Sequence, residues 1–122
     1  MRYLILIYAD EKRWADTPPD QMDAYLKTWW EYDQWLRDQG WHRGGEALQP
    51  TPTATTVRVR DGKTLSTDGP FAETKEQLGG YYLIECDNLD QAIEAAARMP
   101  SSPTGSTEIR PIQEFDQAES QG

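Results

Sequence analysis

Two short segments are apolar on both of their alternating faces, and this constrains the fold more than any other feature of the sequence. The first is Tyr3–Tyr8, which reads Tyr-Leu-Ile-Leu-Ile-Tyr, and the second is Tyr81–Cys86, in which only Glu85 is charged. Side chains alternate between the two faces of a strand, so each segment presents apolar groups on both sides. We therefore expect two central strands that are covered on both faces of their sheet.

Four further segments are predicted to be strands, and two of them form a hairpin. These four segments are residues 44–49, 55–60, 63–67 and 107–112. Asp61-Gly62 lies between the second and third of them and is a strong signal for a two-residue hairpin turn. Pro111 lies near the end of the last one, which predicts a sheet edge or the end of strand pairing there.

Two helices are predicted between the strands. The first starts at Thr17–Asp20, where proline is tolerated in the first turn, and its apolar spacing continues to about Gln39. The second begins after Asn88, which is a good N-cap residue, and ends at Pro100. Its expected buried stripe consists of Leu89, Ala92, Ile93 and Ala96. Residues 9–19 read as a polar connection from which Trp14 folds back onto the domain.

The predicted order is strand, helix, strand, hairpin, strand, helix, strand. Without the hairpin this is the ferredoxin-like split β-α-β sandwich, so we expect an α+β fold with an inserted β-hairpin. In this arrangement both helices cover one face of an antiparallel sheet, and the other face stays bare. We expect one domain over residues 1–115 and a flexible tail at residues 116–122.

The bare face needs a cover, because the two central strands are apolar on that side as well. At about 25 cal/mol per Å², a few hundred Å² of exposed apolar surface costs several kcal/mol and promotes aggregation. A second copy, packed sheet against sheet in a two-fold homodimer, is the simplest cover. The alternative is that the hairpin or the loop after it folds over the face. Trp30 and Trp35 lie outside the apolar stripe of the first helix and are available to an interface between chains.

Charge and composition exclude several classes of function. The net charge is −9 and the sequence has no basic run, which argues against direct binding to nucleic acid or to an anionic membrane surface. No segment approaches the roughly 20 apolar residues of a membrane span, and we expect a cytoplasmic protein. Cys86 and His42 are the only residues of their kinds, so we expect no internal disulfide, no metal site and no cofactor.

Residues 68–82 are an unusually polar stretch that begins Asp-Gly-Pro-Phe and ends Gly-Gly-Tyr-Tyr. Together with Gly44–Leu48 and Glu108–Ile112, this stretch resembles the YCII-related family, in its Asp-Gly-Pro-Phe (DGPF) branch. The resemblance extends over about residues 2–115 and implies a dimeric α/β barrel. It also implies a functional link to an alternative sigma factor, because DGPF relatives are often encoded beside such factors.

The wider family is thought to include enzymes built around a His–Asp pair, with the histidine on the first helix. In this sequence the comparable positions hold Trp29 and Met99-Pro100, so neither member of that pair carries over.

Polar side chains of the DGPF stretch are the first candidates for a functional site. Asp68 and Glu73 are candidate catalytic acid–base groups and ligand contacts, and Lys75 is a candidate for holding an anionic group. An alternative is that Asp68 forms a turn by accepting a backbone N–H. Glu73 and Lys75 could likewise serve only to solvate the surface.

Three strand residues, Glu46, Arg110 and Tyr8, are further candidates for ligand binding. Glu46 and Arg110 could instead pair with each other, because an inward-pointing charge needs a partner. Tyr8 could equally be a core residue with a satisfied hydroxyl group. We interpret His42 as a loop histidine, since the sequence places no catalytic partner beside it.

The sequence leaves three functions open and does not decide whether the protein is an enzyme. The first is binding of a small anionic or aromatic ligand, with a regulatory role, in a pocket between sheet and helices that Asp68–Phe71 rims. The second is cofactor-free, isomerase-like or lyase-like acid–base chemistry by Asp68 or Glu73. The third is a structural interaction module.

Overall fold

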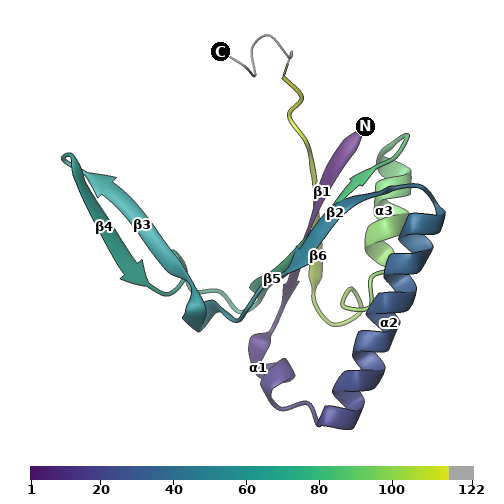
Figure 1. Ribbon diagram of the computed structural model, residues 1–122, viewed down its shortest axis with the longest axis horizontal. Helices are drawn as coiled ribbons and strands as arrows, with labels where there is room; N and C mark the ends of the chain where they lie inside the picture. Colours follow the sequence, from purple (N-terminus) through teal and green to yellow (C-terminus); the bar gives the residue numbers. More distant parts are fainter. Residues whose placement is uncertain (116–122) are drawn as a thin grey trace.

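The computed structural model describes residues 1–115, which form a four-stranded antiparallel sheet, a separate two-stranded hairpin and helices (Figure 1). The strands are β1 (Arg2–Ala9), β2 (His42–Ala47), β3 (Thr55–Arg60), β4 (Lys63–Asp68), β5 (Gln77–Glu85) and β6 (Ser106–Pro111). The helices are α1 (Glu11–Ala15), α2 (Pro19–Asp38) and α3 (Leu89–Ala97), with a short 3₁₀ turn at Thr51–Thr53. The predicted α+β fold with an inserted hairpin is confirmed. The predicted tail, residues 116–122, lies outside the described residues.

The two strands predicted to be central are central. The strand order is β2-β5-β1-β6, so β1 and β5 pair with each other and β2 and β6 form the edges. Tyr3 lies opposite Ile84, and Ile5 lies between Tyr82 on one side and Ile109 on the other. Pro111 ends β6, an edge strand, as its missing N–H requires.

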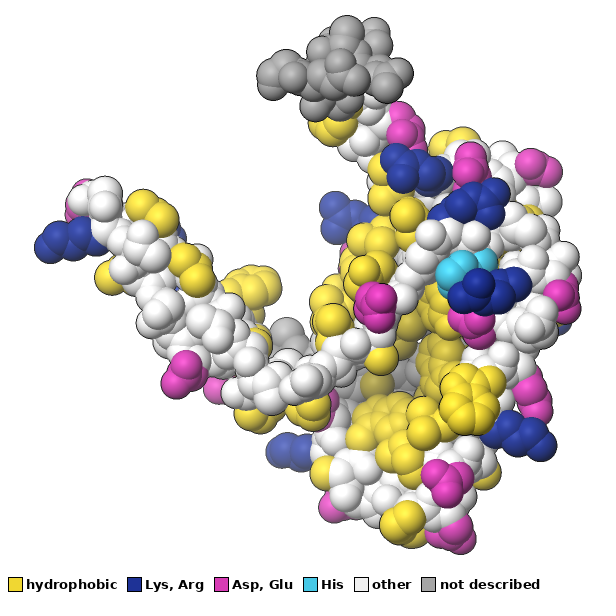
Figure 2. Space-filling view, in the orientation of Figure 1, with side chains coloured by type: hydrophobic (Ala, Val, Ile, Leu, Met, Phe, Trp, Pro, Cys, Tyr) yellow, Lys and Arg dark blue, Asp and Glu magenta, His cyan; other side chains and the backbone are white. Residues whose placement is uncertain are grey.

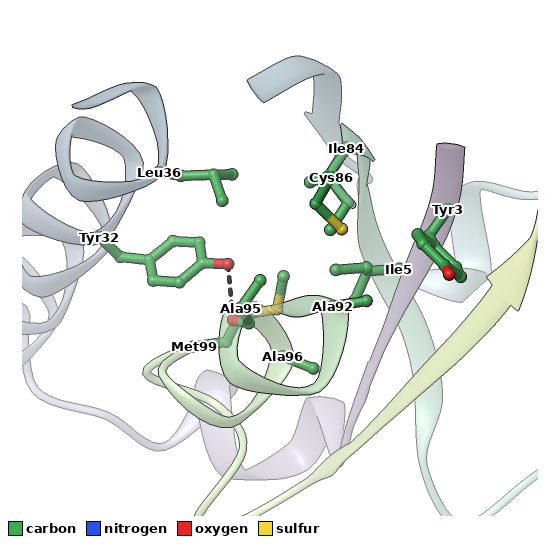
Figure 3. Packing of buried hydrophobic residues seen from close by; sticks show 10 residues of the cluster. All are labelled: Tyr3, Ile5, Tyr32, Leu36, Ile84, Cys86, Ala92, Ala95, Ala96 and Met99. Atoms are coloured by element: carbon green, nitrogen blue, oxygen red, sulfur yellow. Dashed lines mark hydrogen bonds between the residues drawn. The ribbon is translucent and has the colours of Figure 1, made fainter. Parts of the chain in front are cut away.

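Both long helices cover the same face of the sheet, and the core lies between them and the strands (Figure 1). The core is built from ten buried side chains, which are Tyr3, Ile5, Tyr32, Leu36, Ile84, Cys86, Ala92, Ala95, Ala96 and Met99 (Figure 3). The hydroxyl group of Tyr32 donates a 2.7 Å hydrogen bond to the carbonyl oxygen of Ala95, which ties α2 to α3. Cys86 packs here as a small apolar residue.

Helix α3 starts as predicted but faces the core with a different stripe. The Asn88 side chain accepts a hydrogen bond from the backbone N–H of Gln91 and so caps the helix, and the Gln91 side chain accepts one from the backbone N–H of Asp87, the residue before the cap. Leu89 and Ile93, predicted to be buried, are 50% and 49% exposed. Ala92 and Ala96 are buried as predicted, and Ala95 and Met99 complete the buried stripe in place of the two large side chains. This spacing turns small side chains toward the sheet.

The connection before α2 contains a short helix that the sequence analysis missed. In α1, the Asp10 side chain accepts a hydrogen bond from the backbone N–H of Lys12 and so caps the helix. Trp14 stacks on Tyr25 of α2, with ring centroids 4.6 Å apart and planes 12° apart, so it does fold back as predicted.

The two tryptophans outside the α2 stripe have different environments. Trp30 is 73% exposed. Trp35 packs edge-on against Trp41 within the same chain, with ring centroids 5.8 Å apart. The sequence predicts that Trp35 is available to an interface between chains. In the structure its ring packs beside that of Tyr32, a core residue of α2, so this side of α2 faces the core.

The hairpin β3–β4, here called the arm, projects away from the rest of the domain on the side of the sheet opposite α2 and α3 (Figure 1). Asp61 and Gly62 form its turn with φ angles of 53° and 74°, the left-handed pair that tight hairpins need. The arm does not pack over the sheet, and residues 70–75 are exposed throughout. The alternative in which these segments cover the bare face is therefore wrong.

The bare sheet face, here called the open face, is apolar at its centre. Strand pairing places Leu4 beside Leu83 and Leu6 beside Tyr81, and all four side chains are only half-buried. Among residues 1–115, no helix is long and apolar enough to cross a membrane.

Candidate functional site

A hollow of about 170 Å³ lies between the end of β1, α1, α2 and the loop before β6. We call it the aromatic hollow, and its walls include Arg13, Trp14, Tyr25 and Thr104. It adjoins a wider, open groove of about 850 Å³, which shares Tyr25 and Thr104 and continues along α2 to Tyr32, Trp35 and Arg98. Hydrophobic side chains gather between α1 and α2 in this part of the molecule (Figure 2).

Aromatic rings continue from the hollow toward the sheet. Tyr25 stacks between Trp14 and Trp29, and Trp29 stacks in turn on Tyr82 of β5. Burial raises the pKa of Tyr25, so its hydroxyl group stays protonated near neutral pH and can donate a hydrogen bond. Stacked rings at a cavity wall favour a planar, apolar ligand.

Two arginines supply positive charge beside these rings. Arg13 lines the hollow itself. Arg98 lines the groove, where its guanidinium group lies 4.5 Å from the centre of the Trp35 ring and 3.0 Å from the Glu94 carboxylate. Each cavity is also lined by one carboxylate, Asp10 in the hollow and Glu31 in the groove. Aromatic surface next to a guanidinium group suits a planar ligand that carries an anionic group.

Helix α1 is held by contacts to Gln77, which lies within the DGPF stretch (residues 68–82), and to Thr51. The Gln77 side-chain oxygen accepts a 2.9 Å hydrogen bond from the backbone N–H of Glu11. The Glu11 carboxylate in turn accepts hydrogen bonds from the backbone N–H and the hydroxyl group of Thr51, at 2.7 and 2.8 Å. Ser106, two residues after the hollow residue Thr104, donates to the Glu76 carboxylate at 2.6 Å. The stretch therefore holds two walls of the hollow.

A second polar cluster joins α2 to β2 and β5. The Asp33 carboxylate accepts hydrogen bonds from Arg37 Nε at 2.5 Å and from the Tyr82 hydroxyl group at 2.9 Å. His42 Nε2 lies 3.2 Å from an Arg37 nitrogen and 3.7 Å from Asp33 Oδ2. Figure 2 shows the single histidine surrounded by basic and acidic side chains. No partner for His42 is expected from the sequence alone, although Asp33 and Arg37, four residues apart on the helix just before it, are a usable signal.

The electrostatics of this cluster favour a charged Asp33. Burial opposes its ionisation, but the hydrogen bonds from Arg37 and Tyr82, together with the charges of Arg37 and His42, outweigh burial and hold the pKa of Asp33 below its ordinary value. Burial, and then the hydrogen bond to Asp33, raise the pKa of Tyr82. The cluster thus contains one ionised carboxylate with aligned donors.

The structure does not bring the residues predicted from the DGPF stretch into either cavity. Asp68 ends β4, Glu73 and Lys75 lie in the following loop, and all three side chains are exposed. Asp68–Phe71 line neither the hollow nor the groove, because they stand at the base of the projecting arm, and the expected rim stays a prediction. Phe71 is 80% exposed. Ligand binding or catalysis by Asp68, Glu73 and Lys75 stays a prediction.

The three strand candidates all lie on the open face. Glu46 and Arg110 occupy the opposite edge strands, β2 and β6, so they cannot pair within one chain as considered above. Arg110 lies 3.8 Å from Glu108 instead. The Tyr8 hydroxyl group donates to Glu108 at 3.2 Å, and burial followed by this hydrogen bond raises the pKa of Tyr8. Within residues 1–115, no three His, Cys, Asp or Glu side chains are grouped so that they could hold a metal ion.

The fold defines the class of this protein as a small α+β domain with two helices on one face of an antiparallel sheet and an inserted hairpin. The family model described as "YCII-related domain" matches residues 1–116, and the chain belongs to this family. An uncharacterized protein of Rhizobium meliloti (strain 1021) is 36% identical over 114 residues, which cover 92% of each chain.

A solved structure also matches, the 5-chloro-2-hydroxyhydroquinone dehydrochlorinase TftG from Burkholderia phenoliruptrix AC1100 in complex with 2,5-dihydroxybenzoquinone. Its sequence identity is 12% and its TM-score is 0.49, over 94% of this chain and 96% of that chain. The resemblance to the YCII-related family, found in the sequence, is confirmed by the family match.

Proposed function

We propose that the protein is a homodimeric binding protein for a small, planar, aromatic anion, which it holds in the aromatic hollow. The observation that carries this proposal is the stacked pair Trp14–Tyr25 in the wall of a cavity that Arg13 also lines. The rings match a flat apolar face, and the guanidinium group matches a carboxylate.

Calorimetric titration with three matched probes tests the ligand class. Benzoate is planar and anionic, cyclohexanecarboxylate is anionic without an aromatic ring, and benzyl alcohol is aromatic without a charge. We expect benzoate to bind most tightly, by about fivefold, because stacking and ion pairing each contribute on the order of 1 kcal/mol. Equal affinity for all three probes would contradict the proposal.

Two variants locate the binding site. Tyr25→Leu should weaken benzoate binding by removing the ring, and Arg13→Gln should abolish the preference for benzoate over benzyl alcohol. Trp30→Phe is the matched control, because Trp30 is an exposed aromatic residue of α2 that lines neither cavity. Benzoate binding that is unchanged in both variants would place the ligand elsewhere.

The homodimer is proposed from the open face. The half-buried side chains of Leu4, Leu6, Tyr81 and Leu83 form an apolar centre to which the described part of the chain adds no cover. A second copy related by a two-fold axis offers the same surface and buries both. Sedimentation equilibrium measures the mass directly, and a monomer at micromolar concentration would overturn this part of the proposal.

The regulatory part of the proposal depends on the DGPF signature at residues 68–82. Membership of that branch would imply a functional link to an alternative sigma factor. The cytoplasmic location is proposed separately, from the absence in the sequence of a long apolar segment. A test is co-purification of the tagged protein with a sigma factor before and after addition of the ligand found by titration. Transcripts of a strain that lacks the protein would be compared with those of the wild-type strain. Unchanged transcripts would reject the regulatory role, whereas the ligand-binding part of the proposal would stand.

Acid–base catalysis is a second candidate, and it is favoured by the Asp33–His42–Arg37–Tyr82 cluster rather than by Asp68 or Glu73. The Asp33 carboxylate, 3.7 Å from His42 Nε2, and the Arg37 guanidinium group, 3.2 Å from the same nitrogen, can orient the imidazole ring for proton transfer. Compounds that bind would be incubated with wild type, His42→Gln and Glu73→Gln, and conversion followed by NMR. Conversion lost in His42→Gln but kept in Glu73→Gln supports this assignment, and binding without conversion rejects it.

A further inference from the structure

Among residues 1–115 the arm has no packing partner outside itself. In this part of the chain β3 and β4 pair only with each other, and nearly all of their side chains are exposed. Val57 and Val59 are 60% and 58% exposed, which is unusual for two neighbouring β-branched residues on one face of a strand. An isolated two-stranded hairpin is marginally stable in water, so a protruding hairpin with apolar side chains needs another surface.

The two faces of the arm differ in chemistry. Strand pairing places Val57 opposite Ser66 and Val59 opposite Thr64, so this face carries no charge near the tip. The other face presents Arg58 opposite Leu65 and Arg60 opposite Lys63. The first face is therefore suited to packing against protein, and the second is suited to remaining in water.

The arm is also the basic part of an acidic protein. Residues 55–68 contain three basic and two acidic side chains, whereas the remainder of the chain contains nine basic and nineteen acidic ones. The surface of a second copy is thus electrostatically attractive to the arm, and this attraction assists correct docking.

The direction of the arm places it beside the open face. Figure 1 shows it on the side of the sheet away from α2 and α3. Hydrophobic side chains also line the side of the body that faces the arm across an open space (Figure 2). A second copy stacked on the open face would enter this space.

We infer that in the proposed homodimer each arm packs its Val57–Val59 face against the other copy. The inference rests on the dimer proposed above and adds a second contact region outside the sheet face. Phe71, which is 80% exposed just after the arm, extends the same contact. The position of the DGPF signature at the base of the arm then has a structural purpose, because it sets the direction in which the arm leaves the domain.

Photo-cross-linking in mixed-isotope samples tests the arm contact separately from the dimer. The full-length protein would carry p-benzoylphenylalanine in place of Val59, or in place of Arg60 as the matched control on the opposite face. Equal amounts of ¹⁴N and ¹⁵N protein are mixed, irradiated and digested, and the mass of the cross-linked species is measured. Sedimentation of the same samples reports the oligomeric state.

A dimer whose Val59 position yields mixed ¹⁴N–¹⁵N cross-links, at several times the yield of the Arg60 position, supports the inference. A dimer with equal yields at both positions, or with only single-isotope cross-links, overturns the arm contact and leaves the dimer standing. A monomer overturns both.

A second experiment uses the double variant Val57→Ser, Val59→Ser. Its dimer dissociation constant should be at least tenfold higher than that of the wild type, and an unchanged constant would also overturn the arm contact.

Discussion

The side-chain oxygen of Gln77 accepts a hydrogen bond from the backbone N–H of Glu11 at 2.9 Å, although the two residues are 66 positions apart. Gln77 begins β5 at the end of the DGPF stretch, and Glu11 begins α1, one wall of the aromatic hollow. The amide nitrogen of Gln77 donates to the carbonyl oxygen of Thr74 at 2.6 Å, which holds the side chain in place. The DGPF stretch therefore acts on the candidate site by positioning α1.

Replacing Gln77 with alanine should loosen α1 without unfolding the domain. Helix α1 has five residues and no buried side chain, so a few contacts decide how often it opens. Trypsin can cleave after Lys12 and Arg13 only when the helix is open. We expect cleavage there to be about fivefold faster in Gln77→Ala, corresponding to the loss of about 1 kcal/mol for one hydrogen bond. Mass spectrometry of the early fragments measures this rate.

The control for this experiment is Gln34→Ala, which removes an exposed glutamine whose side chain donates a 2.8 Å hydrogen bond to Asp38 on the same helix. Cleavage at Lys12 and Arg13 should remain at the wild-type rate in this variant. If both variants are cleaved equally fast, Gln77 does not position α1.

Leu6→Glu should convert the proposed dimer into a monomer. Leu6 lies on the open face beside Tyr81, where a second copy would bury its side chain. A buried, unpaired carboxylate in the interface costs several kcal/mol. Sedimentation velocity reports the mass, and circular dichroism checks that the monomer is still folded. Leu26→Glu, at a 42% exposed position of α2 on the helix side, should remain dimeric. A dimeric Leu6→Glu protein would show that the open face is not the interface.

Two adjacent glycines of β2 should differ sharply in their tolerance of a methyl group. A Cβ atom at Gly45 would lie 2.8 Å from the carbonyl oxygen of Tyr81 and 3.0 Å from the Cδ1 atom of the Tyr82 ring. A Cβ atom at Gly44 would meet only Leu83, at 3.9 Å. Gly45→Ala should therefore lower the free energy of unfolding by about 1–3 kcal/mol, whereas Gly44→Ala should be nearly neutral. Urea denaturation measures both, and equal effects would contradict the close approach seen here.

The sequence predicted those parts of the fold that depend on local patterns. The two-faced segments Tyr3–Tyr8 and Tyr81–Cys86 placed the centre of the sheet correctly, and Asp61-Gly62 placed the hairpin turn. The buried stripe predicted for α3 is partly wrong, because the prediction placed the large side chains Leu89 and Ile93 in the core and left out Ala95. Ala95 is buried and Leu89 is half exposed, since the helix approaches the sheet through its small residues.

The candidate site was harder to predict because it depends on contacts between distant segments. Asp68 and Glu73 are close in sequence to the apolar strand β5, yet the arm carries them away from both cavities. Trp14 and Tyr25 come together only because α1 exists, and five residues give too weak a helical pattern to recognise. His42 acquires Asp33 as a neighbour only when β2 packs beside α2.

The Asp33–Tyr82 hydrogen bond should make a measurable part of the stability depend on pH. The pKa of Asp33 is lowered from 3.8 in the folded protein, mainly by Arg37 and Tyr82 acting against the effect of burial. A carboxyl group with a lower pKa in the folded state stabilises the fold above its unfolded pKa, and this contribution is lost as the pH falls through the folded value. Stability from Asp33 should therefore be complete at pH 6 and decline below about pH 4.

A double-mutant cycle with Asp33→Asn and Tyr82→Phe isolates this contribution from the rest of the acid titration. The coupling energy from urea unfolding should be about 1 kcal/mol at pH 6, because the bond joins a hydroxyl group to a charged acceptor that is partly open to solvent. The coupling should become smaller as the pH falls through the folded pKa of Asp33, since protonated Asp33 is a weaker acceptor. A coupling energy that stays constant while NMR shows Asp33 becoming protonated would mean that the bond does not depend on the carboxylate charge, and the charge-dependent stability argued for this pair would fail.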